Sequence, residues 1–322
     1  MVDMSVVIRR MRVEDIEDVK RVDMVTWKFL IENSYKDIPK ITPRTDQNIL
    51  SYLRADPDGA FVASDDVGGI IGSAFSHVWG KTGWAGPVSV LPSYQGRGVG
   101  KELVKSSLRY LEDEDCADIG LETMPENTIN VGMYLRAGLK PEGLVLIMGK
   151  KLDERDPPQE AAGKISVERL SESDVKDHIL AQIRRISDSL RPGLDYSKEV
   201  KLTEEFSFGD TLFATAGGKV AGFCLMHTAP RRTEMRACSV RALAVQPGLK
   251  EDIVEALLAS SELIALDVGL PEISVPVQCQ TRRAVDLLFS REYSVVQTFE
   301  RMMWMGSSGS GEKNYNLVTW SG

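Results

Sequence analysis

The sequence is poor in the residues that bind metals and form disulfide bonds. It contains 4 cysteines and 3 histidines in 322 residues, with no Cys-x-x-Cys pair, and they are scattered: Cys116, Cys224, Cys238, Cys279, His77, His178 and His227. A structural zinc site needs four nitrogen or sulfur ligands at close spacing, so we expect no metal. Sparse, unpaired cysteines are typical of the reducing cytosol, and we expect a cytoplasmic protein.

Long apolar runs and basic runs are also missing. The N-terminal segment lacks the apolar core of a signal peptide, and no stretch approaches the roughly 18 apolar residues of a membrane span. Lysine and arginine total 39 against 47 acidic residues, a formal net charge of −8. Without a basic cluster the chain lacks the electrostatic footprint of a nucleic-acid binder. We therefore expect neither a membrane nor a nucleic acid as a partner.

The chain does contain enough apolar material for two hydrophobic cores. Hydrophobic residues make up 43% and charged residues 27%, and at about 100–200 residues per domain the length predicts two domains. The first half alternates between strand and helix patterns in the order β-α-α-β-β-β-α-β-α-β. These elements are expected at 5–10, 13–31, 45–54, 59–66, 68–79, 83–91, 101–114, 117–124, 127–138 and 143–152.

The same order restarts after residues 153–163, whose charge and paired prolines predict an interdomain linker. Residues 253–261 match residues 99–107 without a gap at an offset of 154. A repeat as long as a domain indicates duplication rather than a solenoid. We therefore predict domains over 1–152 and 164–305. The tail over 306–322 begins with GSSGSG, is typical of an added flexible linker, and is excluded from the predicted fold.

One segment between a strand and a helix carries a pattern with chemical meaning. Glycines permit a sharp turn and close approach of a ligand, and the free N–H groups of a helix N-terminus favour phosphate. A dinucleotide fingerprint would need glycine at 101, and a Walker A loop would need glycine at 95 and Ser or Thr at 102. Neither pattern fits the segment Gln95, Gly96, Arg97, Gly98, Val99, Gly100, Lys101 and Glu102.

What fits is a resemblance to the GCN5-related N-acetyltransferase (GNAT) superfamily. Val88-Ser89-Val90-Leu91-Pro92 followed by Gln95, Gly98 and Gly100 resembles its pyrophosphate-binding segment. Downstream, the chain is similar to ribosomal-protein alanine acetyltransferases of this superfamily at Leu121-Glu122-Thr123, Asn127, Met133-Tyr134 and Gly138-Leu139; Asn130, Met133 and Leu139 depart from the pattern. Over residues 5–152 the resemblance implies acetyl-CoA as donor. It also implies an α/β (α+β) fold of two tandem GNAT-like domains, each a mostly antiparallel twisted sheet flanked by helices.

The resemblance also implies roles for single residues. The backbone of Val88, Ser89 and Val90 would pair with the pantetheine arm, and residues 95–101 would hold the pyrophosphate. Asn127 would contact the coenzyme, and it is equally a natural helix N-cap. Tyr134 would protonate the departing thiolate, or else pack in the core. Glu122 would be the general base, or else a solvated strand-end carboxylate.

The second half lacks these groups. At the offset of 154, Gln95 aligns with Leu249, Gly98 with Asp252, Gly100 with Val254, Glu122 with Pro276 and Tyr134 with Leu288. Side chains replace the glycines, and negative charge from Glu251 and Asp252 would repel a pyrophosphate. We therefore predict a degenerate copy that completes the acceptor cleft or replaces a homodimer partner. The protein would be a monomer with an internal pseudo-dimer, or a homodimer.

Together these features predict an acetyl-CoA-dependent N-acetyltransferase. It would transfer the acetyl group directly, in a ternary complex, to a primary amine of a small molecule or peptide. A non-catalytic acyl-CoA-binding sensor is the alternative, because it would keep the glycine-rich loop without needing Glu122 or Tyr134. An acceptor cleft could also use aromatic residues, although these more often belong to the core: Trp27, Tyr35, Trp79 and Trp84.

Overall fold

The computed structural model describes residues 6–34, 42–153, 165–230, 232, 237–248, 251–307 and 315–320. Its first half follows the predicted order of elements. These are β1 (Val7–Arg10), α1 (Ile16–Ser34), α2 (Asp46–Ala55), β2 (Phe61–Ser64), β3 (Ile70–Trp79), β4 (Thr82–Val90), α3 (Val99–Asp113), β5 (Asp118–Thr123), α4 (Thr128–Arg136) and β6 (Lys140–Lys151). Most of the predicted linker over 153–163 lies outside the described residues.

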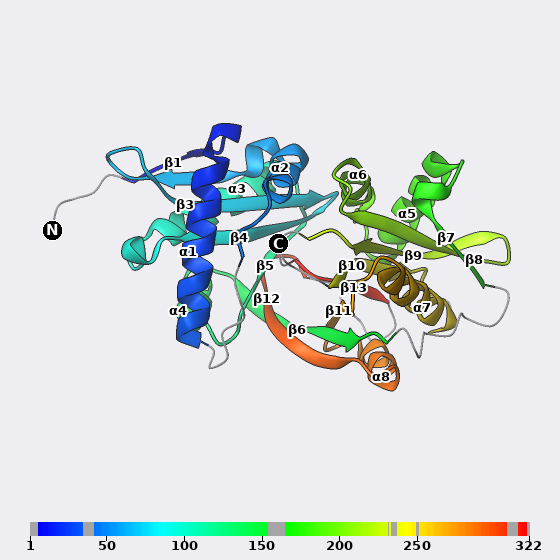
Figure 1. Cartoon of the computed structure of the whole chain (residues 1–322). Coiled ribbons are helices and arrows are strands. Elements are labelled where there is room, and N and C mark those ends of the chain that lie inside the picture. The colour runs from blue at the N-terminus through cyan, green and yellow to red at the C-terminus, as the bar shows by residue number, and fades with distance from the viewer. Residues whose placement is uncertain are drawn as a thin grey trace.

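The second half repeats this order, as Figure 1 shows. Its elements are β7 (Ile165–Arg169), α5 (Lys176–Leu190), α6 (Ser197–Glu205), β8 (Gly209–Ala216), β9 (Lys219–His227), β10 (Cys238–Val245), α7 (Glu251–Asp267), β11 (Glu272–Gln278), α8 (Arg282–Ser290) and β12 (Ser294–Met305). Gly72 and Gly222 occupy matching positions. A Cβ on Gly72 would lie 3.0 Å from the Ser89 carbonyl oxygen, and one on Gly222 would lie 2.9 Å from that of Ala244.

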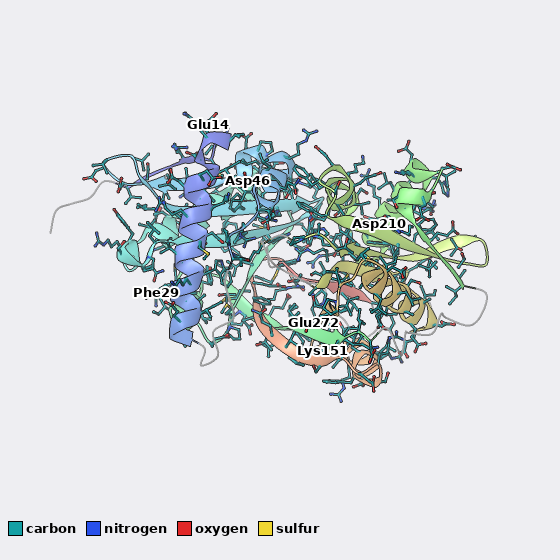
Figure 2. All side chains as sticks on the ribbon, viewed as in Figure 1. Glu14, Phe29, Asp46, Lys151, Asp210 and Glu272 are labelled. Carbon is teal, nitrogen blue, oxygen red and sulfur yellow. The ribbon has the colours of Figure 1, made fainter. Side chains whose placement is uncertain are left out.

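All strands belong to one mixed, mostly antiparallel sheet, in the order β1-β2-β3-β4-β5-β12-β6-β11-β10-β9-β8-β7. The two halves exchange their last strands within it: β12 pairs with β5, and β6 pairs with β11. Lys151 of β6 thus lies opposite Glu272 of β11 (Figure 2). Because β6 and β12 also pair with each other, each half relies on the other to complete its sheet.

Helices cover both faces of the sheet, and the sequence pattern explains which side each helix buries. In α1 and α2, apolar residues spaced three or four apart pack with Phe75 of β3 on one face. The opposite face receives α3, whose Val99 and Leu103 pack with Ile71 and Val90. Among the described helices, none combines the length and apolar character needed to traverse a lipid bilayer.

The C-terminal segment contradicts the prediction that the whole tail lies outside the fold. Residues Asn316–Val318 form β13, which pairs antiparallel with β10. Leu317, Val318 and Trp320 are buried, and removing this apolar surface from water stabilises the segment. The prediction was based on the glycine- and serine-rich start of the tail, and it overlooked the apolar residues that follow. Residues 308–314 and 321–322 lie outside the described part of the chain.

Candidate active site

The parallel strands β4 and β5 pair only at their beginnings. Their partners are Thr82 with Asp118, Gly83 with Ile119, and Trp84 with Gly120. From there β4 continues to Val90 and β5 to Thr123, and the register between them records no further pairs. The edge of β4 beyond Trp84 is therefore available to an extended ligand that adds like a strand.

A β-bulge lies where the two strands part. Ala85 of β4 pairs with Ser76 of β3, and Val88 pairs with Ala74. Gly86 and Pro87 lie between these pairs without a partner in the register and form the bulge. The buried ring of His77 supports it: Nε2 lies 2.9 Å from the Gly86 carbonyl oxygen, and the ring stacks on Trp84 at 3.8 Å. Bulges often re-aim a strand beside a functional site.

A cavity of about 1580 Å³ lies at this opening. Single small ligands usually occupy about 300–1,000 Å³, so the cavity has room for a coenzyme and a second substrate. Most of the predicted site residues line it: Val88, Val90, Gln95, Gly96, Gly98, Gly100, Lys101, Glu122, Asn127 and Tyr134. Ser89 and Val99 are buried in the core instead, and Arg97 lies outside the lining, with its guanidinium 5.6 Å from the centre of the Tyr94 ring.

The glycine-rich loop leaves the N-terminus of α3 open. Gly98 is the N-cap residue in a left-handed conformation (φ +86°), and no side chain caps the helix there. Apart from the glycine and its two chain neighbours, no heavy atom of the described residues lies within 4 Å of where a Cβ would stand on Gly96 or Gly98. The side-chain Nε2 of Gln95 donates to the Val90 carbonyl oxygen at 3.0 Å and so braces the loop against β4. Exposed N–H groups and the helix dipole at such a helix start favour a bound anion.

Tyr134 and Asn127 both belong to α4. The side chain of Asn127 accepts a hydrogen bond from Asn130 N at 3.1 Å, so it caps the helix, as its alternative role predicted. Tyr134 is buried among apolar side chains and borders the cavity. Among the described residues its hydroxyl has no recorded hydrogen bond, and burial raises the pKa of Tyr134 to about 12. Its phenol is therefore a proton donor at neutral pH.

The side chain of Glu122 on β5 is buried, and its carboxylate oxygens are held by several donors. Arg301 of β12 donates to Oε1 from Nε at 3.0 Å and also from Nη2, an ion pair whose side chains are 0% and 2% exposed. Oε2 accepts from Thr319 Oγ1 at 2.7 Å and from Trp320 N at 2.9 Å. Glu122 is thus not the solvated carboxylate of the alternative prediction.

Arg301, Thr319 and Trp320 were missed by the sequence reasoning. The guanidinium of Arg301 also donates to the Val318 carbonyl oxygen at 2.8 Å and lies 4.2 Å from the centre of the Trp320 ring. Arg301 stands directly before the apolar run of residues 302–305, and a charged residue at the start of such a run is the sequence signal that points to a buried ion pair.

Of the four aromatic residues considered for an acceptor cleft, Trp27 lines the cavity, whereas Trp79 and Trp84 belong to a buried core cluster. Tyr35 lies outside the described residues.

Comparison with known proteins agrees with this geometry. Residues 24–139 match the Acetyltransferase (GNAT) family. Residues 24–139 therefore form a domain of the GNAT family. An acetyltransferase of Sodalis glossinidius is 29% identical over 109 residues, which are 34% of this chain and 76% of that protein.

Solved structures extend the likeness to both GNAT-like halves. A GCN5-related N-acetyltransferase from Sphaerobacter thermophilus covers 94% of this chain and 96% of its own, with a TM-score of 0.62 at 14% identity. A tandem GNAT protein from the clavulanic acid biosynthesis pathway covers 93% of this chain and 98% of its own, with a TM-score of 0.62 at 13% identity. At these identities the likeness is one of fold.

The first half has an open slot between β4 and β5. The matching slot in the second half, between β10 and β11, is closed. Strands β10 and β11 pair only at Cys238 with Ile273 and at Ser239 with Ser274. Beyond these residues β13 pairs with β10 and also contacts β11. In addition, the Tyr315 hydroxyl donates to Glu251 Oε1 at 2.6 Å in the first turn of α7. A strand of the chain itself thus takes the place of an extended ligand.

Proposed function

We propose that the protein transfers the acetyl group of acetyl-CoA to a primary amine by direct transfer in a ternary complex. The observation that carries this proposal is a single cavity that joins the open edge of β4, the uncapped N-terminus of α3 and the phenol of Tyr134. The pantetheine arm would pair with β4, and the pyrophosphate would meet the first N–H groups of α3. The match of residues 24–139 to the GNAT family supports acetyl transfer as the reaction.

In this reaction the lone pair of the neutral amine attacks the thioester carbonyl carbon. A carbon–nitrogen bond forms, and the carbonyl oxygen becomes negative until the carbon–sulfur bond breaks. Backbone N–H groups on the open part of β4 would stabilise that oxygen. The departing thiolate takes the proton of the Tyr134 hydroxyl, and the proton lost by the amine nitrogen passes to water. The tyrosinate then regains a proton from the solvent, so the hydroxyl is restored for the next turnover.

For Glu122 we propose a positioning role in place of the base predicted from the sequence. A base must lie within hydrogen-bond reach of the proton that it removes, and both oxygens of Glu122 already accept bonds from Arg301, Thr319 and Trp320. These bonds tie β5 to β12 and to the C-terminal segment. Glu122 would therefore fix the wall of the cavity on which the acetyl group rests.

Release of free thiol from acetyl-CoA, measured against a panel of amines that includes N-terminal peptides, tests the proposed function. We expect turnover with at least one amine and none without an acceptor. Tight binding of acetyl-CoA without turnover on any amine would contradict the proposal and favour the acyl-CoA sensor.

A further inference from the structure

Three of the arginines that line the cavity come from the α1–α2 connection and from the second half: Arg44, Arg232 and Arg241. Building on the proposed function, we propose that the acceptor carries an oxyanion, either a carboxylate or a phosphate, and that these arginines bind it. Arginine suits this task because its planar guanidinium matches both groups.

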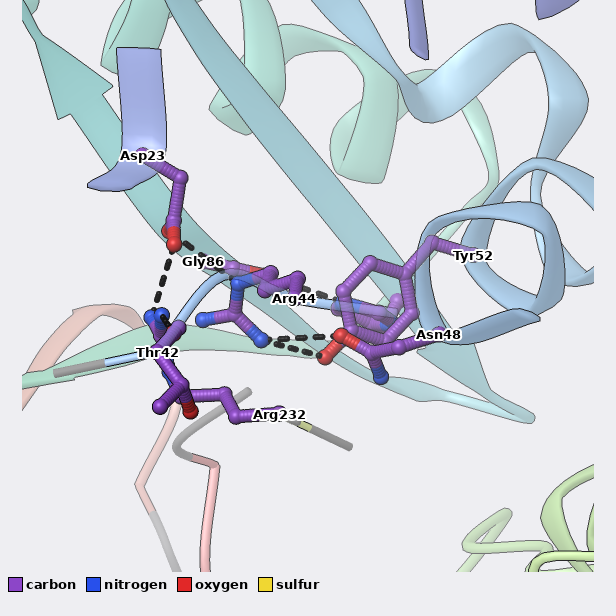
Figure 3. A network of polar contacts seen from close by, with 8 residues as sticks. Asp23, Thr42, Arg44, Asn48, Tyr52, Gly86 and Arg232 are labelled. Atoms are coloured by element: carbon purple, nitrogen blue, oxygen red, sulfur yellow. Dashed lines mark hydrogen bonds and ion pairs between the residues drawn. The ribbon is translucent and has the colours of Figure 1, made fainter. Parts of the chain in front are cut away.

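Two of the arginines share one carboxylate. Arg44 Nε donates to Asp23 Oδ1 at 3.0 Å, and Arg232 Nη2 donates to Asp23 Oδ2 at 2.8 Å (Figure 3). The two guanidinium groups therefore share the Asp23 carboxylate as a partner. Burial, together with the charge of Arg44, lowers the pKa of Arg232. A bound oxyanion would relieve this repulsion.

Both guanidinium groups are held in place before any ligand arrives. Arg44 is buried, and its Nη1 donates to Asn48 Oδ1 at 2.9 Å beside the ring of Tyr52 (Figure 3). Arg232 Nη1 donates to the Thr42 carbonyl oxygen at 2.9 Å. Fixed donors reduce the entropy that binding would cost.

Arg241 reaches the cavity through a β-bulge. The register of β10 against β9 skips this residue, passing from Val240 to Ala242 opposite neighbouring residues of β9. When Val90 is aligned with Val245, Arg241 matches Gly86, which lies in the bulge of β4. The degenerate half has thus kept the bulge and placed a buried cation in it.

This arginine cluster is separate from the site expected for the phosphates of the coenzyme. Asp23, Arg44 and Tyr52 belong to the layer of α1 and α2, and α3 with its open N-terminus packs on the opposite face of the sheet. Among the described residues, two acidic side chains line the cavity: Glu122, which pairs with Arg301, and Glu126, which lies beside the N-terminus of α4. The acceptor side therefore favours negative charge even though the whole chain carries −8.

Calorimetric titration of the full chain saturated with coenzyme A tests the inference with matched ligands. Glucosamine 6-phosphate is compared with glucosamine, and alanine with alaninamide. We expect the anionic member of at least one pair to bind about tenfold more tightly or better, and the pair that shows this preference identifies phosphate or carboxylate. If neither anion binds more tightly than its partner, the inference is wrong.

Variants localise the effect. R232Q should abolish the tighter binding of the anionic ligand, glucosamine 6-phosphate or alanine. It should leave the affinity for the ligand without the anionic group, glucosamine or alaninamide, unchanged. R232K should keep part of the preference for the anionic ligand. R54Q, at an arginine that is 67% exposed, is the matched control and should behave as the parent chain. Equal preference in R232Q and the parent would overturn the assignment. Thiol release with the same compounds is scored separately, so an anion preference without turnover refutes acetyl transfer and not the anion site.

Discussion

At the scale of single residues, the site combines groups whose position the sequence revealed with groups that it hid. Tyr134 was found because it stands at a fixed step after Glu122 in a contiguous motif. Its environment then gives it the property that the chemistry needs, a phenol that stays protonated. Arg301 lies 179 residues beyond Glu122, and only the exchange of strands brings the two together. Pairings of this kind depend on the whole topology, which local patterns do not encode.

Replacing Tyr134 with phenylalanine should lower kcat by about a hundredfold to ten-thousandfold, the range for loss of a general acid. The KM for acetyl-CoA and the free energy of unfolding should change little, because the hydroxyl makes no recorded hydrogen bond among the described residues. Burial raises the pKa of Tyr134 to about 12. In the parent chain the hydroxyl should therefore keep its proton at every pH below about 10, and its ionisation should not lower kcat in that range. An unchanged kcat in Y134F would refute the role.

Replacing Glu122 with glutamine should leave Arg301 buried without its countercharge. The expected loss is about 3–5 kcal/mol in the free energy of unfolding, measured by urea denaturation. R301Q should cost a similar amount, and the double variant E122Q/R301Q should cost less than the sum of the two. A base would instead reveal itself in activity: if E122Q folds with near-parental stability and removes one limb of the pH profile of kcat, the positioning role is wrong.

At the scale of elements, the order and type of the helices and strands of both halves were predictable from apolar periodicity and turn residues. The one large error concerned β13. Three residues paired with β10 stabilise little by themselves, and the segment gains its place from burial of Leu317, Val318 and Trp320 in a slot shaped by distant elements. Sequence periodicity carries no information about a slot of this kind, and the preceding glycine and serine run suggested the opposite.

Truncating Leu317 to alanine should lower the free energy of unfolding by about 2–5 kcal/mol, as for other buried leucines. Val67, which is 88% exposed in the β2–β3 turn, supplies the control: V67A should change stability by less than about 0.5 kcal/mol. Urea denaturation of both variants provides the comparison. Equal and small effects would show that β13 contributes nothing to the folded chain.

At the scale of the whole molecule, the chain consists of two GNAT-like halves whose matching slots are filled differently. The first half keeps an open strand edge and a glycine-rich helix start. The second half fills its matching slot with β13 and lends Arg232, Arg241 and Arg301 to the site or its support. The exchange of β6 and β12 joins the two halves into one sheet, which holds these residues in register with the first half. The central claim is therefore one acetyl-CoA site per chain, located in the first half.

Calorimetric titration with acetyl-CoA tests that claim most directly, because the chain offers a matched pair of glycines. Gly98 before α3 and Gly248 before α7 have nearly equal left-handed backbones (φ +86° and +84°), and neither has a heavy atom within 4 Å of where its Cβ would lie. G98V and G248V should therefore impose similar backbone strain, about 1–3 kcal/mol. The account predicts one acetyl-CoA per chain for the parent and G248V, and affinity weakened by about tenfold or more for G98V. Two sites per chain, or loss of binding in G248V with retention in G98V, would contradict it.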